Sequence, residues 1–325
     1  MQKMKWMAAA LLLAGSVAWA AELSEADKHA ISEANTYWVR GNKASEDGSL
    51  ERARVEYKRA LKIFPKHVDA LYNLAVTCEK MGENKEAVGL YKQYLDLKPD
   101  DADVWSQLGG RYEKMDQKEE AQAAFEKALA LNPKFGIANH NLGVMLMEQG
   151  KMDEAQKHLE TFVQLEEAAG RKSPDAYYSL GGLLLARGRV KDAKLQFLKA
   201  LDADPSLSYV NNAMGDVYLA EKHADLAVDS YKKALEKDSK YAPAYSGLGD
   251  AYGQLGQVDK AAESYRKALQ IRSDYNLVHY KLGLLFETAK PAEAIKHFEK
   301  YLSSGKKGEF AKEAQEKLDK LKPKK

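Results

Sequence analysis

A position occupied by a small residue recurs at a fixed interval through most of this 325-residue chain. Its members lie 34 residues apart, except for one interval of 38, and they are Gly41, Ala75, Gly109, Gly143, Gly181, Gly215, Gly249 and Gly283. A period of this length is typical of repeat proteins, in which one supersecondary unit is copied along the chain and stacked on its neighbours. The length of the chain therefore counts repeats and does not estimate the number of domains.

Two further columns of residues keep the same period. A second small column consists of Ala53, Ala87, Ala121, Ala155, Ala193, Ala227, Ala261 and Ala294. A bulky column follows it four residues later and consists of Tyr57, Tyr91, Phe125, Leu159, Phe197, Tyr231, Tyr265 and Phe298. Residues four apart share one face of a helix, so these columns predict a buried helical face in every repeat.

The third repeat shows how one unit is built. Leu108 and Tyr112 fall on one face of a first helix, Ala121 and Phe125 fall on one face of a second, and Pro133 ends the second helix. Glycine inside a helix costs about 1 kcal/mol relative to alanine. Its recurrence therefore predicts a close approach of the two helices, with Phe125 filling the space left between repeats.

This pattern resembles the tetratricopeptide repeat, on the strength of Trp105, Leu108, Gly109, Tyr112, Ala121, Phe125, Ala128 and Pro133. The resemblance covers residues 34 to about 308 in eight repeats. It implies an all-α fold, a right-handed α-solenoid (superhelix) of eight helix-turn-helix repeats. It also implies a concave groove lined by the first helix of each repeat, and a role as a scaffold that holds partner proteins.

The regular spacing breaks once, between repeats 1–4 (residues 34–169) and repeats 5–8 (residues 174–308). In the inserted residues 170–173, Gly170 suits a left-handed helix end, Ser173 an N-cap, and Pro174 the first position of a new helix. We expect either a hinge here or a longer loop with undisturbed stacking.

Helical segments are expected at both ends of the array. Residues 22–33 are predicted to extend the first helix. Residues 309–325 are predicted to form a capping helix and a basic tail, because their apolar residues recur at helical spacing. The apolar face consists of Phe310, Ala314, Leu318 and Leu321.

Residues 1–21 have the pattern of a cleaved secretory signal peptide. Lys3 and Lys5 precede an apolar run, and small residues stand where signal peptidase cuts, after Ala20 or Ala21. The apolar run is shorter than the ~20 residues that a spanning helix needs. The sequence therefore predicts a periplasmic or secreted bacterial protein without a transmembrane segment after cleavage, the alternative being an uncleaved anchor.

Composition and motifs argue against several functions. The formal net charge is +2, which gives no electrostatic case for nucleic acid. Cys78 is the single cysteine, so no disulfide forms within the chain, and we expect it to be buried. The histidines are scattered, with Glu293 and His297 forming a surface pair, and no group has the spacing of a metal site. The sequence predicts no catalytic residues and no cofactor, hence no enzyme.

The residues expected to line the groove lie on the first-helix face opposite the core. They are Trp38, Asn42, Tyr72, Asn73, Gln107, His140, Asn141, Tyr178, Asn212, Asp216, Asp250 and Tyr280. The expected ligand is a neutral or basic segment of a protein partner, extended or helical, because the cations needed to grip a terminal carboxylate are missing. Exposed aromatic residues, among them Tyr178, Tyr209 and Tyr280, would supply contacts. The alternative is a self-assembling structural protein, a homo-oligomer.

Overall fold

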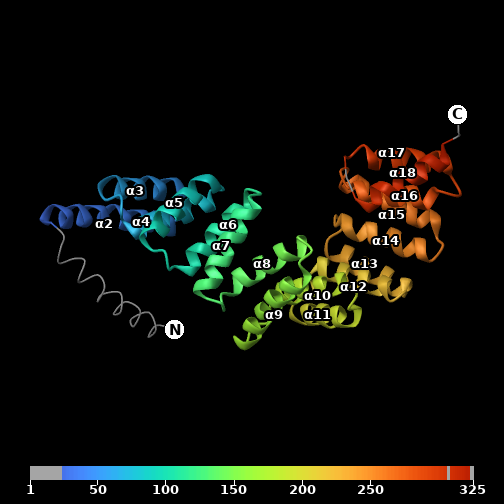
Figure 1. The fold of residues 1–325 in the computed structure, drawn as a ribbon, viewed down its shortest axis with the longest axis horizontal. Coiled ribbons are helices and arrows are strands. Elements are labelled where there is room, and N and C mark those ends of the chain that lie inside the picture. The colour runs from blue at the N-terminus through green and yellow to red at the C-terminus, as the bar shows by residue number, and fades with distance from the viewer. Residues whose placement is uncertain (1–23, 306–307, 323–325) are drawn as a thin grey trace. The chain divides into compact units, whose positions relative to one another are not determined.

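The computed structural model describes residues 24–305 and 308–322, so the predicted signal peptide lies outside the described residues. Within these ranges every regular element is a helix, and there is no strand (Figure 1). The first helices of the repeats are α2 (Glu25–Glu46), α4 (Val68–Lys80), α6 (Ala102–Lys114), α8 (Gly136–Glu148), α10 (Pro174–Ala186), α12 (Ser208–Ala220), α14 (Ala242–Gln254) and α16 (Asn276–Phe286). The second helices are α3 (Leu50–Ile63), α5 (Asn84–Leu97), α7 (Lys118–Leu131), α9 (Met152–Ala168), α11 (Val190–Ala203), α13 (Ala224–Lys237), α15 (Val258–Ile271) and α17 (Pro291–Leu302), and α18 (Glu309–Leu321) ends the series.

The chain forms two compact units, an N-terminal unit that ends at Met145 and a C-terminal unit that begins at Leu146. In the N-terminal unit successive helices from α2 to α7 pack against each other, α6 with α7 being the last such pair. In the C-terminal unit the same holds from α9 to α18, and first helices also contact each other, α10 with α12 and α12 with α14. The division falls within α8, and a hinge at residues 170–173 stays a prediction.

The helix ends follow the local sequence. Ser24 and Asp27 form a capping box at the start of α2, which runs unbroken through the expected extension into the first repeat. Gly170 has a φ of 70°, a conformation that glycine adopts without steric cost. The Ser173 side chain accepts a hydrogen bond from the Ala176 backbone N–H at 3.4 Å, and Pro174 is the first residue of α10. These three boundary predictions are confirmed.

The recurring glycines permit contact with the bulky column, as predicted, but the contact lies inside each repeat. A Cβ atom added to Gly109 would come within 2.7 Å of the Phe125 ring in the same repeat, and one added to Gly181 within 2.6 Å of Phe197. Tyr231 differs, because it meets both Gly215 of its own repeat and Gly247 of the next. The close approach at Gly109 thus lies within one repeat, whereas Tyr231 bridges two repeats, and the expectation that Phe125 also fills a space between repeats stays a prediction.

The helix α18 packs against α16 and α17 at the end of the C-terminal unit. Ala314 and Leu318 are buried there in one apolar cluster with Phe298 and Tyr301. Phe310 was expected on the buried face but is 52% exposed, although its ring centroid lies 5.2 Å from that of a residue of α16, Tyr280.

Candidate partner-binding surfaces

In the N-terminal unit, two of the predicted residues bond to each other across neighbouring repeats. The Asn42 side-chain carbonyl accepts hydrogen bonds from the Tyr57 hydroxyl and from the Asn73 amide, each at 2.8 Å. Asn42 lies on α2 and Asn73 on α4, and both side chains are half-buried. The acceptor oxygen of Asn42 is therefore used within the protein.

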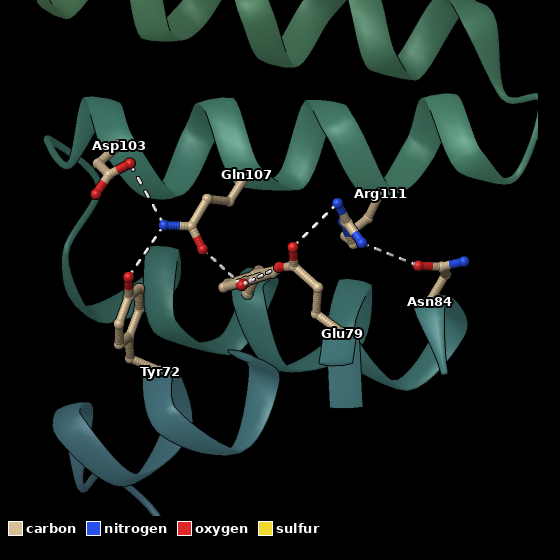
Figure 2. Close-up of polar contacts among 7 residues, drawn as sticks. Tyr72, Glu79, Asn84, Asp103, Gln107 and Arg111 are labelled. Atoms are coloured by element: carbon tan, nitrogen blue, oxygen red, sulfur yellow. Dashed lines mark hydrogen bonds and ion pairs between the residues drawn. The ribbon is translucent and has the colours of Figure 1, made fainter. Parts of the chain in front are cut away.

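Gln107 links the next two repeats. Its carbonyl accepts a hydrogen bond from the Tyr91 hydroxyl at 2.6 Å, and its amide donates to the Tyr72 hydroxyl at 3.0 Å and to the Asp103 carboxylate at 3.3 Å. Figure 2 shows the Gln107 amide between Tyr72 and Asp103. Gln107 is thus saturated by partners from α4, α5 and its own helix.

The same network continues along α6 through a charged pair (Figure 2). The Arg111 guanidinium lies 3.1 Å from a Glu79 carboxylate oxygen and donates to the Asn84 amide oxygen at 3.3 Å. A Glu79 carboxylate oxygen also lies 2.9 Å from the Tyr91 hydroxyl, so Glu79 and Gln107 share its single proton. Burial, together with the charge of Glu79, raises the pKa of Tyr91, so the phenol remains a donor. We call Asn42, Tyr72, Asn73 and Gln107 the N-terminal surface.

The other predicted residues before α10 are Trp38, His140 and Asn141. Trp38 was expected to be exposed but is half-buried, with its ring centroid 5.9 Å from that of His67. Its Nε1 donor is buried and has no partner among the described residues. His140 and Asn141 lie on α8 and are half-buried.

The C-terminal unit carries an aromatic pair where Tyr178 was predicted. The Tyr178 ring meets that of Tyr209 edge-on, with centroids 4.7 Å apart, and both residues are half-buried. The Tyr209 hydroxyl donates to the Asp175 carboxylate at 2.8 Å. Edge-on pairs of this kind hold aromatic rings in a fixed orientation.

Asp216 lies beside this pair in α12. It directly follows Gly215, which belongs to the recurring small position that we call the glycine column. Its carboxylate accepts hydrogen bonds from the Tyr231 hydroxyl at 2.6 Å and from the Asn212 amide at 3.3 Å. The residue is open to solvent along one side, yet protein surrounds its carboxylate closely enough that desolvation raises its pKa to about 6. Among the described residues no cation pairs with it, and the Asn212 side-chain oxygen is buried without a partner.

Asp250 occupies the equivalent place one repeat later, but it is paired. It accepts a hydrogen bond from the Tyr265 hydroxyl at 2.7 Å. The Lys281 ammonium from α16 donates to the Asp250 carboxylate at 2.5 Å and to the Ser246 hydroxyl at 3.1 Å. We call Tyr178, Tyr209, Asn212, Asp216 and Asp250 the C-terminal surface.

Tyr280 does not belong to a binding surface, contrary to the prediction from the sequence. It is buried, at 5% exposure, among Phe298, Tyr301 and Phe310. Its hydroxyl donates to the Glu313 carboxylate of α18 at 2.6 Å. The capping helix covers the face that neighbouring repeats leave open, and this removes Tyr280 from the candidate site.

Sequence reasoning missed the hydroxyl groups of the bulky column, which reach from the core to these surfaces. A polar residue directly after the glycine column marks three of the four: Asn42 accepts from Tyr57, Asp216 from Tyr231 and Asp250 from Tyr265. The exception is Tyr91, in whose repeat Val76 stands at that position. Where the bulky residue has no hydroxyl, the following position is Gly110, Val144, Gly182 or Leu284. This co-occurrence is visible in the sequence and could have identified the contacts.

Two other clusters offer ligand-type atoms. Cys78, Glu83 and Glu86 place one such atom each within 4.8 Å of one another. Arg54 pairs with both carboxylates, and burial raises the pKa of the Cys78 thiol to about 11, so an ion pair beside a buried neutral thiol accounts for the cluster. Cys78 is buried, as predicted.

The second cluster corrects the interpretation of His297 as a member of a surface pair. His297 is half-buried, and its Nδ1 lies 3.0 Å from Nδ1 of His279, with the two rings stacked. Burial lowers the pKa of both imidazoles. The contact joins α16 to α17 and belongs to the packing of the last repeat.

These observations define an all-α solenoid of helical repeats, with polar and aromatic side chains on its first helices. Family models confirm the assignment by matching as tetratricopeptide repeats over residues 44–109, 102–135 and 135–206 and as TPR repeats over residues 215–256 and 249–289. The chain belongs to the tetratricopeptide repeat family. The repeats support a role as a protein-protein interaction scaffold, and proteins of this family are generally not enzymes.

Solved structures of several proteins share the fold. The Cut9–Hcn1 hetero-tetramer of the APC/C matches with a TM-score of 0.64 at 20% identity, over 90% of this chain, which spans 55% of that one. A tetratricopeptide repeat protein from Parabacteroides merdae matches with a TM-score of 0.62 at 17% identity, over 78% of this chain and 99% of its own. A human IFIT1 dimer matches with a TM-score of 0.60 at 18% identity, over 86% of this chain and 72% of its own.

No curated protein matches the sequence significantly. In the described ranges, no helix combines the length and the apolar character needed to cross a membrane.

Proposed function

We propose that this protein is a scaffold of the bacterial cell envelope that binds an extended or helical segment of a partner protein through its C-terminal surface. The observation that carries the proposal is the set of groups there without a full complement of internal partners. Asp216 has no cation, and the Tyr178–Tyr209 pair is partly open to solvent. Rigid aromatic residues beside a charged group are typical of energetic hot spots in interfaces.

The N-terminal surface supports binding less well. Asn42, Asn73 and Gln107 already bond to groups of the protein, and a ligand would have to break those bonds before forming its own. Such an exchange gains little free energy, because one hydrogen bond replaces another. We therefore place the main binding energy in the C-terminal unit.

Mutation of the aromatic pair tests the proposed binding surface. Peptides selected on the full chain from a phage-displayed random dodecapeptide library are expected to lose at least tenfold in affinity with Tyr178→Ala. The matched control is Tyr252→Ala, which removes a half-buried tyrosine of the same unit whose ring lies under Lys260. If Tyr178→Ala and Tyr252→Ala bind every selected peptide as the wild type does, the C-terminal surface is not the binding site.

The envelope location rests on residues 1–21 and has its own test. N-terminal sequencing of the protein purified from a periplasmic extract of a bacterial host is expected to begin at Ala21 or Glu22. A chain that keeps Met1 and stays in the cytoplasmic fraction would contradict this location and would leave the binding proposal intact.

A further inference from the structure

The repeats provide an internal comparison for Asp216. The first residue after the glycine column is Asp216 in repeat 6 and Asp250 in repeat 7. The residue three places before the glycine is Asn212 in repeat 6 and Ser246 in repeat 7. Each aspartate also accepts a hydrogen bond from the tyrosine of its own bulky column, at 2.6 and 2.7 Å. The two repeats therefore present matching oxygen ligands.

The difference lies in what the next repeat supplies. Two places before its glycine, repeat 8 carries Lys281, whose ammonium bonds to Asp250 and Ser246. Repeat 7 carries Gly247 at that place, which has no side chain to offer to Asp216 and Asn212. The same place is filled in the N-terminal unit, where Asn73 bonds to Asn42 and Gln107 accepts from Tyr91. Of these four junctions, the one at Gly247 lacks the bond, as does the junction of repeats 5 and 6, where Ala213 stands at this place.

Gly247 cannot easily be replaced by a larger residue. A Cβ atom at this position would collide with the Tyr231 ring, which packs against both Gly215 and Gly247. The packing of Tyr231 thus keeps the position free of a side chain. It leaves a carboxylate without a counter-ion and, in Asn212, a buried oxygen without a donor.

We propose that Asp216 and Asn212 bind the ammonium group of a lysine side chain from the partner segment, in the place that Lys281 fills for Asp250 and Ser246. This inference rests on the proposed function and specifies the ligand of the same surface. A primary ammonium fits because it is the group that the equivalent oxygens hold in the next repeat. Tyr178 and Tyr241 lie near enough for the charge of Asp216 to contribute to raising the pKa of both, after burial, and their rings offer faces that attract a cation.

The electrostatic surroundings of the Asp216 carboxylate favour the binding of a cation. Desolvation is the main cause of the raised pKa of Asp216, and the neighbouring charge of Asp250 adds to it. Lys281 opposes this shift, but its ammonium is engaged with Asp250. A second ammonium placed at Asp216 would lower its pKa by stabilising the charged carboxylate.

The test uses the peptides selected on the full chain, resynthesised with lysine, acetyl-lysine or arginine at each lysine position. Acetylation of one lysine is expected to weaken binding at least tenfold, and Asp216→Asn is expected to do the same while still accepting the Tyr231 hydrogen bond. Asp229→Asn is the control, because it removes the same charge from an exposed position of α13 outside the C-terminal surface and should change affinity less than twofold. Circular dichroism confirms that the variants remain folded.

The outcomes separate the two proposals. Peptides that need Tyr178 but bind equally with acetyl-lysine, or equally to Asp216→Asn, would overturn the lysine site and leave the binding surface standing. Peptides whose affinity changes neither with Tyr178→Ala nor with Asp216→Asn would overturn both proposals. A direct readout uses n-butylammonium chloride, which should move the carboxyl carbon resonance of Asp216 more than that of Asp229. Equal responses, or none, would also overturn the lysine site.

Discussion

The two units use one repeat geometry to make surfaces of different chemical character. In the N-terminal unit, amide, phenol and ionic groups bond to one another across the repeats from Asn42 to Arg111. In the C-terminal unit, Asp250 is paired with Lys281, whereas no cation of the described residues pairs with Asp216. A single position before the glycine column decides between the two conditions, because it is the position that reaches back to the preceding repeat. Surface chemistry in this array therefore varies with one position of the repeat, and at Gly247 the packing of Tyr231 goes with the change.

The largest expected effect comes from adding a side chain at Gly247. Gly247→Ala should destabilise the C-terminal unit by about 1–3 kcal/mol, because its methyl group collides with the Tyr231 ring. Gly253→Ala in the same helix meets nothing within 4 Å and should stabilise by up to about 1 kcal/mol through helix propensity. Urea denaturation measures both. Equal effects of the two substitutions would show that Gly247 is not required by packing.

The next prediction contrasts the paired and unpaired aspartates. Asp250→Asn should destabilise by about 1–2 kcal/mol, since it leaves the Lys281 ammonium without its counter-ion in a half-buried place. The side chains of Lys281 and Asp250 are 23% and 31% exposed, which keeps the loss below that of a fully buried pair. Asp216→Asn should cause no loss at pH 7. Urea midpoints that fall equally for both variants would contradict the difference between the two repeats.

A smaller effect is expected from removing a hydroxyl beneath the N-terminal surface. Tyr91→Phe should cost about 1 kcal/mol, because Glu79 and Gln107 lose the hydroxyl proton that they share. Tyr252→Phe is the control, since its hydroxyl has no hydrogen-bond partner among the described residues. Thermal denaturation followed by circular dichroism compares them, and an unchanged midpoint for Tyr91→Phe would mean that water replaces the hydroxyl freely.

The smallest expected effect is a dependence of stability on pH at Asp216. Its pKa in the folded protein, about 6, lies above the ordinary value of 3.8, so the folded state holds the proton more tightly than the unfolded chain does. The contribution of this carboxyl to stability therefore falls as the pH rises from about 4 to about 6. Desolvation is the main cause of the raised pKa and the charge of Asp250 adds to it, whereas the Tyr231 hydrogen bond and the charge of Lys281 oppose it.

Asp216→Asn should remove that dependence. It should raise stability relative to the wild type at pH 7 by less than about 1 kcal/mol, since the carboxylate keeps contact with water, and it should have no effect below pH 4. Thermal midpoints of both proteins between pH 4 and pH 8 give the comparison. A difference that does not change with pH would place the pKa of Asp216 near its ordinary value.

Much of the fold could be predicted from the sequence because the responsible interactions are local. The spacing of Ala121 and Phe125 predicted a second helix, and Gly170, Ser173 and Pro174 marked a helix end and a helix start. Periodicity and capping act within a few residues, so a single chain displays them. The candidate site was harder to predict from the sequence. Tyr280 has the position on its helix expected of a groove residue, and it becomes buried only when α18 docks on it.

The sequence by itself determined the helix pairs, their number and the places where small residues let the helices approach, since each follows from a column repeated every 34 residues. Only the tertiary structure decided which polar groups are satisfied. Asp216 and Asp250 look alike along the chain, and their difference depends on residues 31 positions further on, Gly247 and Lys281. Hydrogen bonds and ion pairs between repeats depend on distances of a few ångströms, which the order of residues does not specify.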